Sequence, residues 1–112
     1  MDSIILLYGK RIKELVEKMR PPVDIRSQLD IGYSYEKGAL ELFEARPKSG
    51  NTSEIIHHSF AKAKFIKSSN IWKIYWKRAS GKWELYIEEP EVSDVLEFFR
   101  IVNEDKLNVS MG

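Results

Sequence analysis

The fold is decided by residues 71–88, which read IWKIYWKRASGKWELYIE. Apolar and aromatic side chains alternate with lysine and glutamate on both sides of Ser80-Gly81, and a period of two is typical of β-strands. A small residue followed by glycine suits a tight turn between two strands. We therefore expect a β-hairpin made of strands 71–78 and 82–88.

The register of this hairpin, with its turn centred on Ser80-Gly81, sorts the two faces by chemistry. The pairs are Lys77 with Glu84, Tyr75 with Tyr86 and Lys73 with Glu88 on one face, and Arg78 with Trp83, Trp76 with Leu85 and Ile74 with Ile87 on the other. A one-residue slip would turn one strand over and destroy the sorting, which favours this register. The tryptophans are then expected to point into the core.

Helical periodicity marks the start of the chain. The residues at helical spacing are Ile4, Ile5, Tyr8, Ile12, Leu15, Val16 and Met19. Pro21-Pro22 ends the pattern, because proline disrupts a helix interior. We expect a helix over residues 3–20.

Another hairpin is expected from strands 28–35 and 39–46, joined by the two-residue loop Lys37-Gly38. Counting from this loop pairs Tyr35 with Leu40, Tyr33 with Leu42, Gly32 with Phe43, Ile31 with Glu44 and Asp30 with Ala45. Opposite a phenylalanine, Gly32 requires either a ring lying over the glycine or a bulge in the strand.

Two further elements complete the chain. Ala61, Ala63 and Phe65 alternate with lysines, which predicts a strand over residues 54–66. A final helix over residues 92–104 is predicted from Val92, Val95, Leu96, Phe99 and Val102, with Ser93 as N-cap and Asp94 in the first turn. The remaining C-terminal residues are expected to form a tail.

Length and composition limit the class of protein. The chain has 112 residues, a net charge of +1 and no cysteine, which suits one domain over residues 1–112 and excludes disulfides and thiol chemistry. The element order predicts an α+β fold, a curved five-stranded antiparallel meander with both helices packed on one face. Residues 4–7 are too short for a membrane span of about 20 residues and have the wrong flanking charges for a signal peptide, so we expect a cytoplasmic protein.

Charge is segregated along the chain. No acidic residue occurs between Glu54 and Glu84, and the side chains there and just beyond that suit an anionic partner are Lys62, Lys64, Lys67, Lys82, Tyr75 and Tyr86. Lysines contact phosphates, and aromatic rings stack on the bases of single strands. Against this interpretation, the predicted register places Lys73 and Lys77 opposite glutamates and turns the tryptophans inward.

Adjacent histidines do not predict a metal site. His57 and His58 point to opposite faces of a strand, and the chain has no third histidine. No Gly-x-Ser-x-Gly elbow and no glycine-rich phosphate loop occurs. We therefore expect no metal, no cofactor and no catalytic residue, and we lean against an enzyme.

One acidic arrangement remains open. Asp30 with Glu44 and Arg46 is similar to the carboxylates of metal-dependent nucleases. In the favoured register Asp30 faces Ala45, so the two carboxylates point to opposite sides of the sheet. A three-residue loop in that hairpin would make them neighbours.

The motif W-x-h-Y-W-x-R at residues 72–78, followed by K-W-x-x-Y at residues 82–86, Pro90 and a terminal helix ending near Asp105, resembles a family of small bacterial proteins classed only as a domain of unknown function. The chain departs from that pattern at Ser80 and Glu84, where the family carries Asp and His, and in its tail, which lacks cysteine. The resemblance implies a bacterial, cytoplasmic protein with no established activity.

The interpretation that we favour is a non-catalytic binding or self-association module. A meander exposes two strand edges, and such edges support a homodimer or a protein partner. The alternative is an accessory nucleic-acid-binding protein that uses the basic face of residues 60–82.

Overall fold

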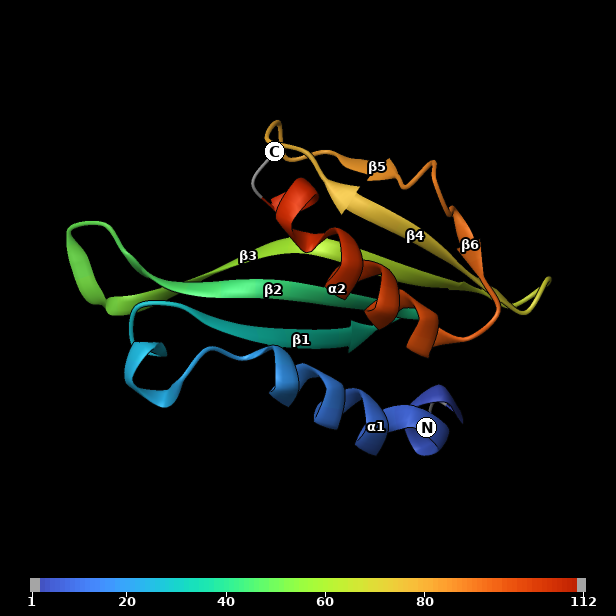
Figure 1. Ribbon diagram of the computed structural model, residues 1–112, viewed down its shortest axis with the longest axis horizontal. Helices are drawn as coiled ribbons and strands as arrows, with labels where there is room; N and C mark the ends of the chain where they lie inside the picture. Colours follow the sequence, from blue (N-terminus) through green and yellow to red (C-terminus); the bar gives the residue numbers. More distant parts are fainter. Residues whose placement is uncertain (1–2, 111–112) are drawn as a thin grey trace.

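The computed structural model describes residues 3–110, with side chains from Tyr8 to Glu104. In chain order the elements are α1 (Ser3–Met19), the short 3-10 helix η1 (Val23–Ile25), β1 (Asp30–Glu36), β2 (Ala39–Lys48), β3 (Asn51–Ile66), β4 (Ile71–Lys77), β5 (Trp83–Leu85), β6 (Glu91–Val92) and α2 (Val95–Ser110). The strands form an antiparallel sheet in the order β1-β2-β3-β4-β5, and β6 also pairs with β4 (Figure 1). The predicted α+β class is confirmed.

A single apolar core lies on one face of the sheet. In Figure 1, α2 crosses the sheet and α1 runs beside β1. The buried core residues are Ile12 and Val16 of α1, Leu40, Leu42, Ala61, Ala63, Trp72, Ile74, Trp76 and Val92 of the strands, and Val95, Phe98, Phe99, Ile101 and Val102 of α2. Both helices thus contribute to the same core, and we call the opposite side of β2 to β5 the open face.

The register of the first hairpin is confirmed. Lys37 and Gly38 have φ values of 51° and 77°, as a two-residue turn requires, and Gly32 lies opposite Phe43 without an irregularity. A Cβ added to Gly32 would lie 2.6 Å from Cζ of Phe43. The ring therefore covers the glycine, which is the first of the two arrangements expected there.

The predicted register of the second hairpin is wrong by one residue. Lys77 lies opposite Trp83, Trp76 opposite Glu84 and Tyr75 opposite Leu85. The cause is a three-residue loop of Ala79, Ser80 and Gly81, because the Arg78 N–H donates to the Lys82 carbonyl at 2.8 Å and the Gly81 N–H donates to the Arg78 carbonyl at 2.8 Å. Gly81 takes φ of 88°, the left-handed conformation that closes such a loop.

The strand predicted over residues 82–88 is shorter and is followed by a separate β6. The Ile74 carbonyl accepts from the Tyr86 N–H at 2.8 Å, and the Ile74 N–H donates to the Pro90 carbonyl at 3.0 Å. Both bonds use one residue of β4, so residues 87–89 leave the sheet between them. The predicted pairs of Lys73 with Glu88 and of Ile74 with Ile87 are therefore absent, and Lys73 lies opposite Glu91.

Several predicted boundaries also move. β1 starts at Asp30 because the N–H groups of Gln28 and Leu29 bond to the Ile25 carbonyl in a turn. Asp94, rather than Ser93, caps α2, since its Oδ1 accepts from the Leu96 N–H at 2.9 Å. The helix then continues to Ser110, where a tail was expected.

Some expectations concern parts of the chain that lie outside the described residues. These are the core contacts of Ile4 and Ile5, the side chain of Asp105 and the end of the tail at residues 111–112.

Candidate functional site

The open face of β3, β4 and β5 gathers lysines and aromatic rings. Its members are Lys62, Lys64, Lys73, Tyr75, Lys77 and Trp83, which we call the basic aromatic face. Lys62 lies opposite Tyr75, Lys64 opposite Lys73, and Lys77 opposite Trp83. Opposite residues of antiparallel strands share a side, as do alternate residues along one strand, so all six side chains point the same way.

Lys62 lies at the centre of this face. Its ammonium nitrogen is 4.5 Å from the centroid of the Trp83 ring and 5.1 Å from that of Tyr75, and the Lys77 nitrogen is 5.4 Å from Trp83. All three distances fall within the range of a cation–π interaction, about 6 Å. A ring carries no net charge, so these contacts position the ammonium groups without neutralising them.

Local electrostatics show a surplus of positive charge. Partial burial holds the pKa of Lys62 below its ordinary value, the Glu41 carboxylate opposes that shift, and the ammonium groups of Lys64 and Lys77 add to it. Within residues 8–104, no carboxylate forms an ion pair with a lysine of the basic aromatic face. Glu41 lies opposite Lys62 and Glu91 lies opposite Lys73, so the lysines of the face that have no carboxylate across the ladder in the described sheet are Lys64 and Lys77.

Three of the six residues predicted for an anionic partner come together, namely Lys62, Lys64 and Tyr75. Lys67 lies in the turn between β3 and β4, and Lys82 lies beside the loop between β4 and β5, at the other end of β4. Tyr86 is not on this face. Its ring meets Trp76, a core residue, edge-on at 5.5 Å between centroids.

Sequence reasoning missed three members of the face: Lys73, Lys77 and Trp83. The predicted register, which is wrong by one residue, places both lysines opposite glutamates and turns all three tryptophans into the core. In the structure Trp72 and Trp76 do point into the core, but Trp83 does not. The one signal that could have shown this was Gly81, because glycine serves the left-handed position of a three-residue loop as well as a two-residue turn.

Comparison with known proteins gives one match. The family model described as a domain of unknown function (DUF3024) matches residues 5–112. The chain belongs to the DUF3024 family. No curated protein and no solved structure matches this DUF3024 chain.

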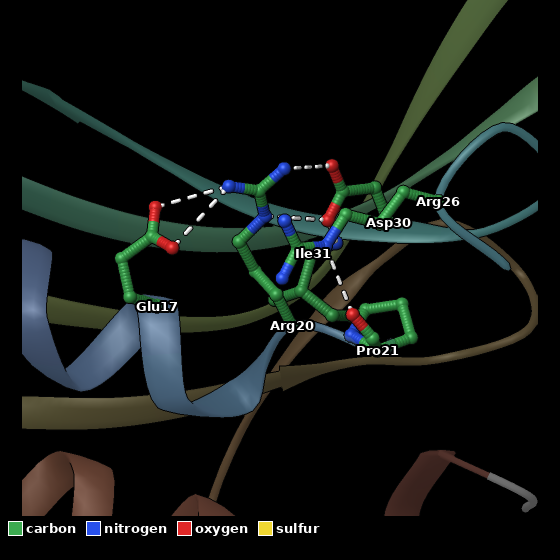
Figure 2. A network of polar contacts seen from close by, with 6 residues as sticks. All are labelled: Glu17, Arg20, Pro21, Arg26, Asp30 and Ile31. Atoms are coloured by element: carbon green, nitrogen blue, oxygen red, sulfur yellow. Dashed lines mark hydrogen bonds and ion pairs between the residues drawn. The ribbon is translucent and has the colours of Figure 1, made fainter. Parts of the chain in front are cut away.

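A separate polar network joins α1 to β1 in the DUF3024 domain (Figure 2). The Arg20 guanidinium donates to both Asp30 oxygens, at 2.9 and 2.8 Å, and to both Glu17 oxygens, at 3.0 and 3.3 Å. Asp30 Oδ1 also accepts from the Ile31 N–H at 2.8 Å. These bonds, chiefly the one from Arg20, lower the pKa of Asp30, and the carboxylates raise that of Arg20. The network is a structural clamp at the end of α1.

The register of the first hairpin rules out the nuclease-like arrangement of Asp30 and Glu44. Asp30 lies opposite Ala45, and Glu44 lies opposite Ile31, so the two carboxylates face opposite sides of the sheet. Glu44 instead forms an ion pair with Arg46 at 3.3 Å.

The histidines lie on the long β2–β3 hairpin. His57 stacks on Phe43 with ring centroids 4.1 Å apart, and His58 lies opposite Glu44. In the part of the chain that the structure describes, no group of three His, Cys, Asp or Glu is placed to hold a metal ion. A search of the same residues finds no helix with the length and hydropathy of a membrane span.

Proposed function

We propose that the DUF3024 domain is a non-catalytic binding module whose basic aromatic face holds single-stranded nucleic acid. The observation that carries this proposal is the position of the Lys62 ammonium between the Tyr75 and Trp83 rings. Proteins that bind single strands combine rings that stack on bases with cations that follow the phosphates. Both kinds of group occur here on adjacent strands of one rigid sheet.

Two features of the second hairpin support this proposal. Lys77 lies opposite Trp83 rather than Glu84, so its charge remains available to a ligand. Lys73 lies opposite Glu91 rather than Glu88, but the two form no ion pair within residues 8–104. Trp83 lies on the open face rather than in the core. The face has four lysines and two rings, as many as the sequence indicated, but Lys73, Lys77 and Trp83 take the places of Lys67, Lys82 and Tyr86.

Single strands fit this surface better than duplexes. Rings on a sheet stack only on unpaired bases, whereas the bases of a duplex are already stacked on one another. Four cations contact few phosphates, so we expect micromolar binding that weakens with salt. As part of this proposal the domain acts in the bacterial cytoplasm, which the resemblance of residues 72–86 implies. Self-association uses a different surface, the edge of β3, and is independent of this face.

The test is a titration of the protein with a fluorescein-labelled single-stranded 12-mer of mixed sequence, followed by anisotropy at two salt concentrations. The variant Lys64→Glu/Lys77→Glu reverses two exposed charges on the face. The matched control Lys10→Glu/Lys13→Glu makes the same change on exposed positions of α1. Circular dichroism checks that both variants fold.

We expect the face variant to weaken binding at least tenfold and the α1 control to change it less than threefold. A duplex of the same sequence should bind more weakly than the single strand. Equal losses in both variants would mean that net charge alone drives binding. That result, or no binding at low salt, overturns the proposal.

A further inference from the structure

β3 has an unpaired edge over its first half. β4 pairs with β3 only from Ala61 to Ile66, so in the described chain residues 55–59 pair with β2 on one side and have no strand on the other. The β2–β3 ladder is irregular just before them, at residues 52–54, which have no partner on β2. Figure 1 shows the β2–β3 hairpin extending past the ends of β1 and β4. Such an edge presents peptide N–H and C=O groups to any strand that can align with them.

The alternation of the antiparallel ladder shows which peptide groups face outward. The two-residue turn makes Glu36 and Ala39 the first hydrogen-bonded pair, so the peptide groups of Ala39 and of every second residue after it on β2 point toward β1. The peptide groups of the residues between them, including Glu44 and Arg46, point toward β3. Their partners on β3 are His58 and Ile56. The peptide groups of the intervening residues, Ile55 and His57, therefore point to the free edge.

The position of Pro47 supports this assignment of the outward peptide groups. It lies opposite Ile55, and the same alternation turns its nitrogen away from β3, where a missing N–H costs no ladder bond.

We propose that a second copy of this chain pairs antiparallel with this edge, about a two-fold axis at Ile56. In that register the outward peptide groups of Ile55 meet those of His57 of the partner subunit, and Ile56 lies opposite its own symmetry mate. Glu54 then lies opposite His58 of the partner subunit, and His58 opposite Glu54 of the partner subunit. The order Glu, Ile, His at alternate positions is thus complementary to itself, which is the condition that a two-fold interface imposes.

Side chains along this edge are exposed in the single chain, as expected if a second copy covers them. Ile55 is 51% exposed, which is high for an apolar residue inside a strand. Among the side chains of residues 8–104, Glu54 forms one ion pair, with the exposed Lys48 at 3.7 Å, and so remains able to face a second copy. The paired area is small, so we expect a weak dimer with a Kd of about 10 µM to 1 mM.

Sedimentation velocity over a concentration series up to about 1 mM tests the dimer, and charge exchange tests its register. All variants are made in a Glu44→Gln background, because Glu44 lies opposite His58 within one subunit. In that background Glu54→Lys places lysine opposite His58 of the partner subunit, and His58→Glu places two glutamates opposite each other across the interface. Each single variant should raise the dimer Kd about tenfold, because two symmetric pairs lose their attraction. Glu88→Lys, an exposed position outside the strands, is the matched control and should leave the Kd unchanged.

Recovery of the dimer in a double variant is the decisive result. The double variant Glu54→Lys/His58→Glu should recover the dimer, because each new lysine then faces a new glutamate. An equimolar mixture of the two single variants should also form a heterodimer more tightly than either forms a homodimer. A protein that stays monomeric to 1 mM, or a dimer unaffected by both single variants, overturns the proposal. Single-strand binding is measured separately at low protein concentration, so its failure would not be mistaken for this one.

Discussion

The ammonium nitrogen of Lys62 on β3 lies 4.5 Å from the centroid of the Trp83 ring on β5. The contact spans β4 and exists only because the three-residue loop turns Trp83 to the open face. Trp72 and Trp76 are buried in the core, so Trp83 is the tryptophan that a ligand on this face would touch.

If a ligand contacts Trp83, its binding should change the tryptophan fluorescence of the protein, and Trp83→Phe tests this. Oligonucleotide binding should quench the intrinsic fluorescence of the wild-type protein, and the variant should lose most of the quenching. Its affinity should fall less than tenfold, because phenylalanine still stacks on a base. Fluorescence and anisotropy titrations of the same samples separate the two effects. Full quenching in the variant would place the ligand elsewhere.

Salt dependence measures how many lysines contact phosphate. Each phosphate neutralised on a single strand contributes about −0.7 to the slope of log K against log salt, so four lysines give a slope of about −3. Lys73→Ala and Lys77→Ala should each reduce its magnitude by about 0.7. Lys10→Ala on α1 should leave the slope unchanged, and a slope near zero for the wild-type protein would contradict phosphate contact.

Gly32→Ala should destabilise the fold by about 1–2 kcal/mol, because the new Cβ would lie 2.6 Å from Cζ of Phe43. Phe43 cannot move freely, since its ring is stacked on His57. In a Phe43→Leu background the same substitution should cost less, because the ring is gone. Urea unfolding of the four proteins of this double-mutant cycle gives the coupling energy. Equal costs in both backgrounds would show that backbone propensity, rather than the ring, determines the effect.

Asp30→Asn should lower stability at pH 7 in a way that depends on pH. The folded pKa of Asp30 is depressed by Arg20, so its contribution is present above the unfolded value of about 3.9 and is lost as pH falls through the folded pKa. The wild-type protein should therefore unfold about 2–4 °C above the variant at pH 7, with a smaller gap near pH 3. Thermal melts at both values measure the gap. Glu14→Gln is the control, because Glu14 forms an exposed ion pair with Arg11 on α1, away from Asp30.

The first hairpin shows what local sequence determines. Lys37-Gly38 allows one short turn, and the apolar pattern on both sides agrees with it, so every predicted pair from Tyr35 with Leu40 to Asp30 with Ala45 is present. Turn chemistry and burial specify the same register there.

The second hairpin shows where such reasoning fails. Ser80-Gly81 suits a two-residue turn, and the ion pairs of that register sort both faces well, but exposed ion pairs contribute little free energy. The structure instead uses the positive φ of Gly81 in a longer loop and places the Trp83 ring against Lys62. That contact joins strands that are not neighbours in the sheet, so no count along one hairpin could reveal it. The candidate site was predicted only in part for this reason.

The largest fully buried side chains, Phe98 and Phe99, belong to α2, which follows every strand of the sheet in the sequence. During synthesis the strands therefore emerge before the helix that covers them. Until residues 95–102 have been made, Leu40, Leu42 and Ile74 lack the α2 part of the core that buries them in the finished domain. A nascent chain of this protein passes through an interval with an uncovered apolar sheet, and that interval, more than the finished domain, is when it needs protection from aggregation.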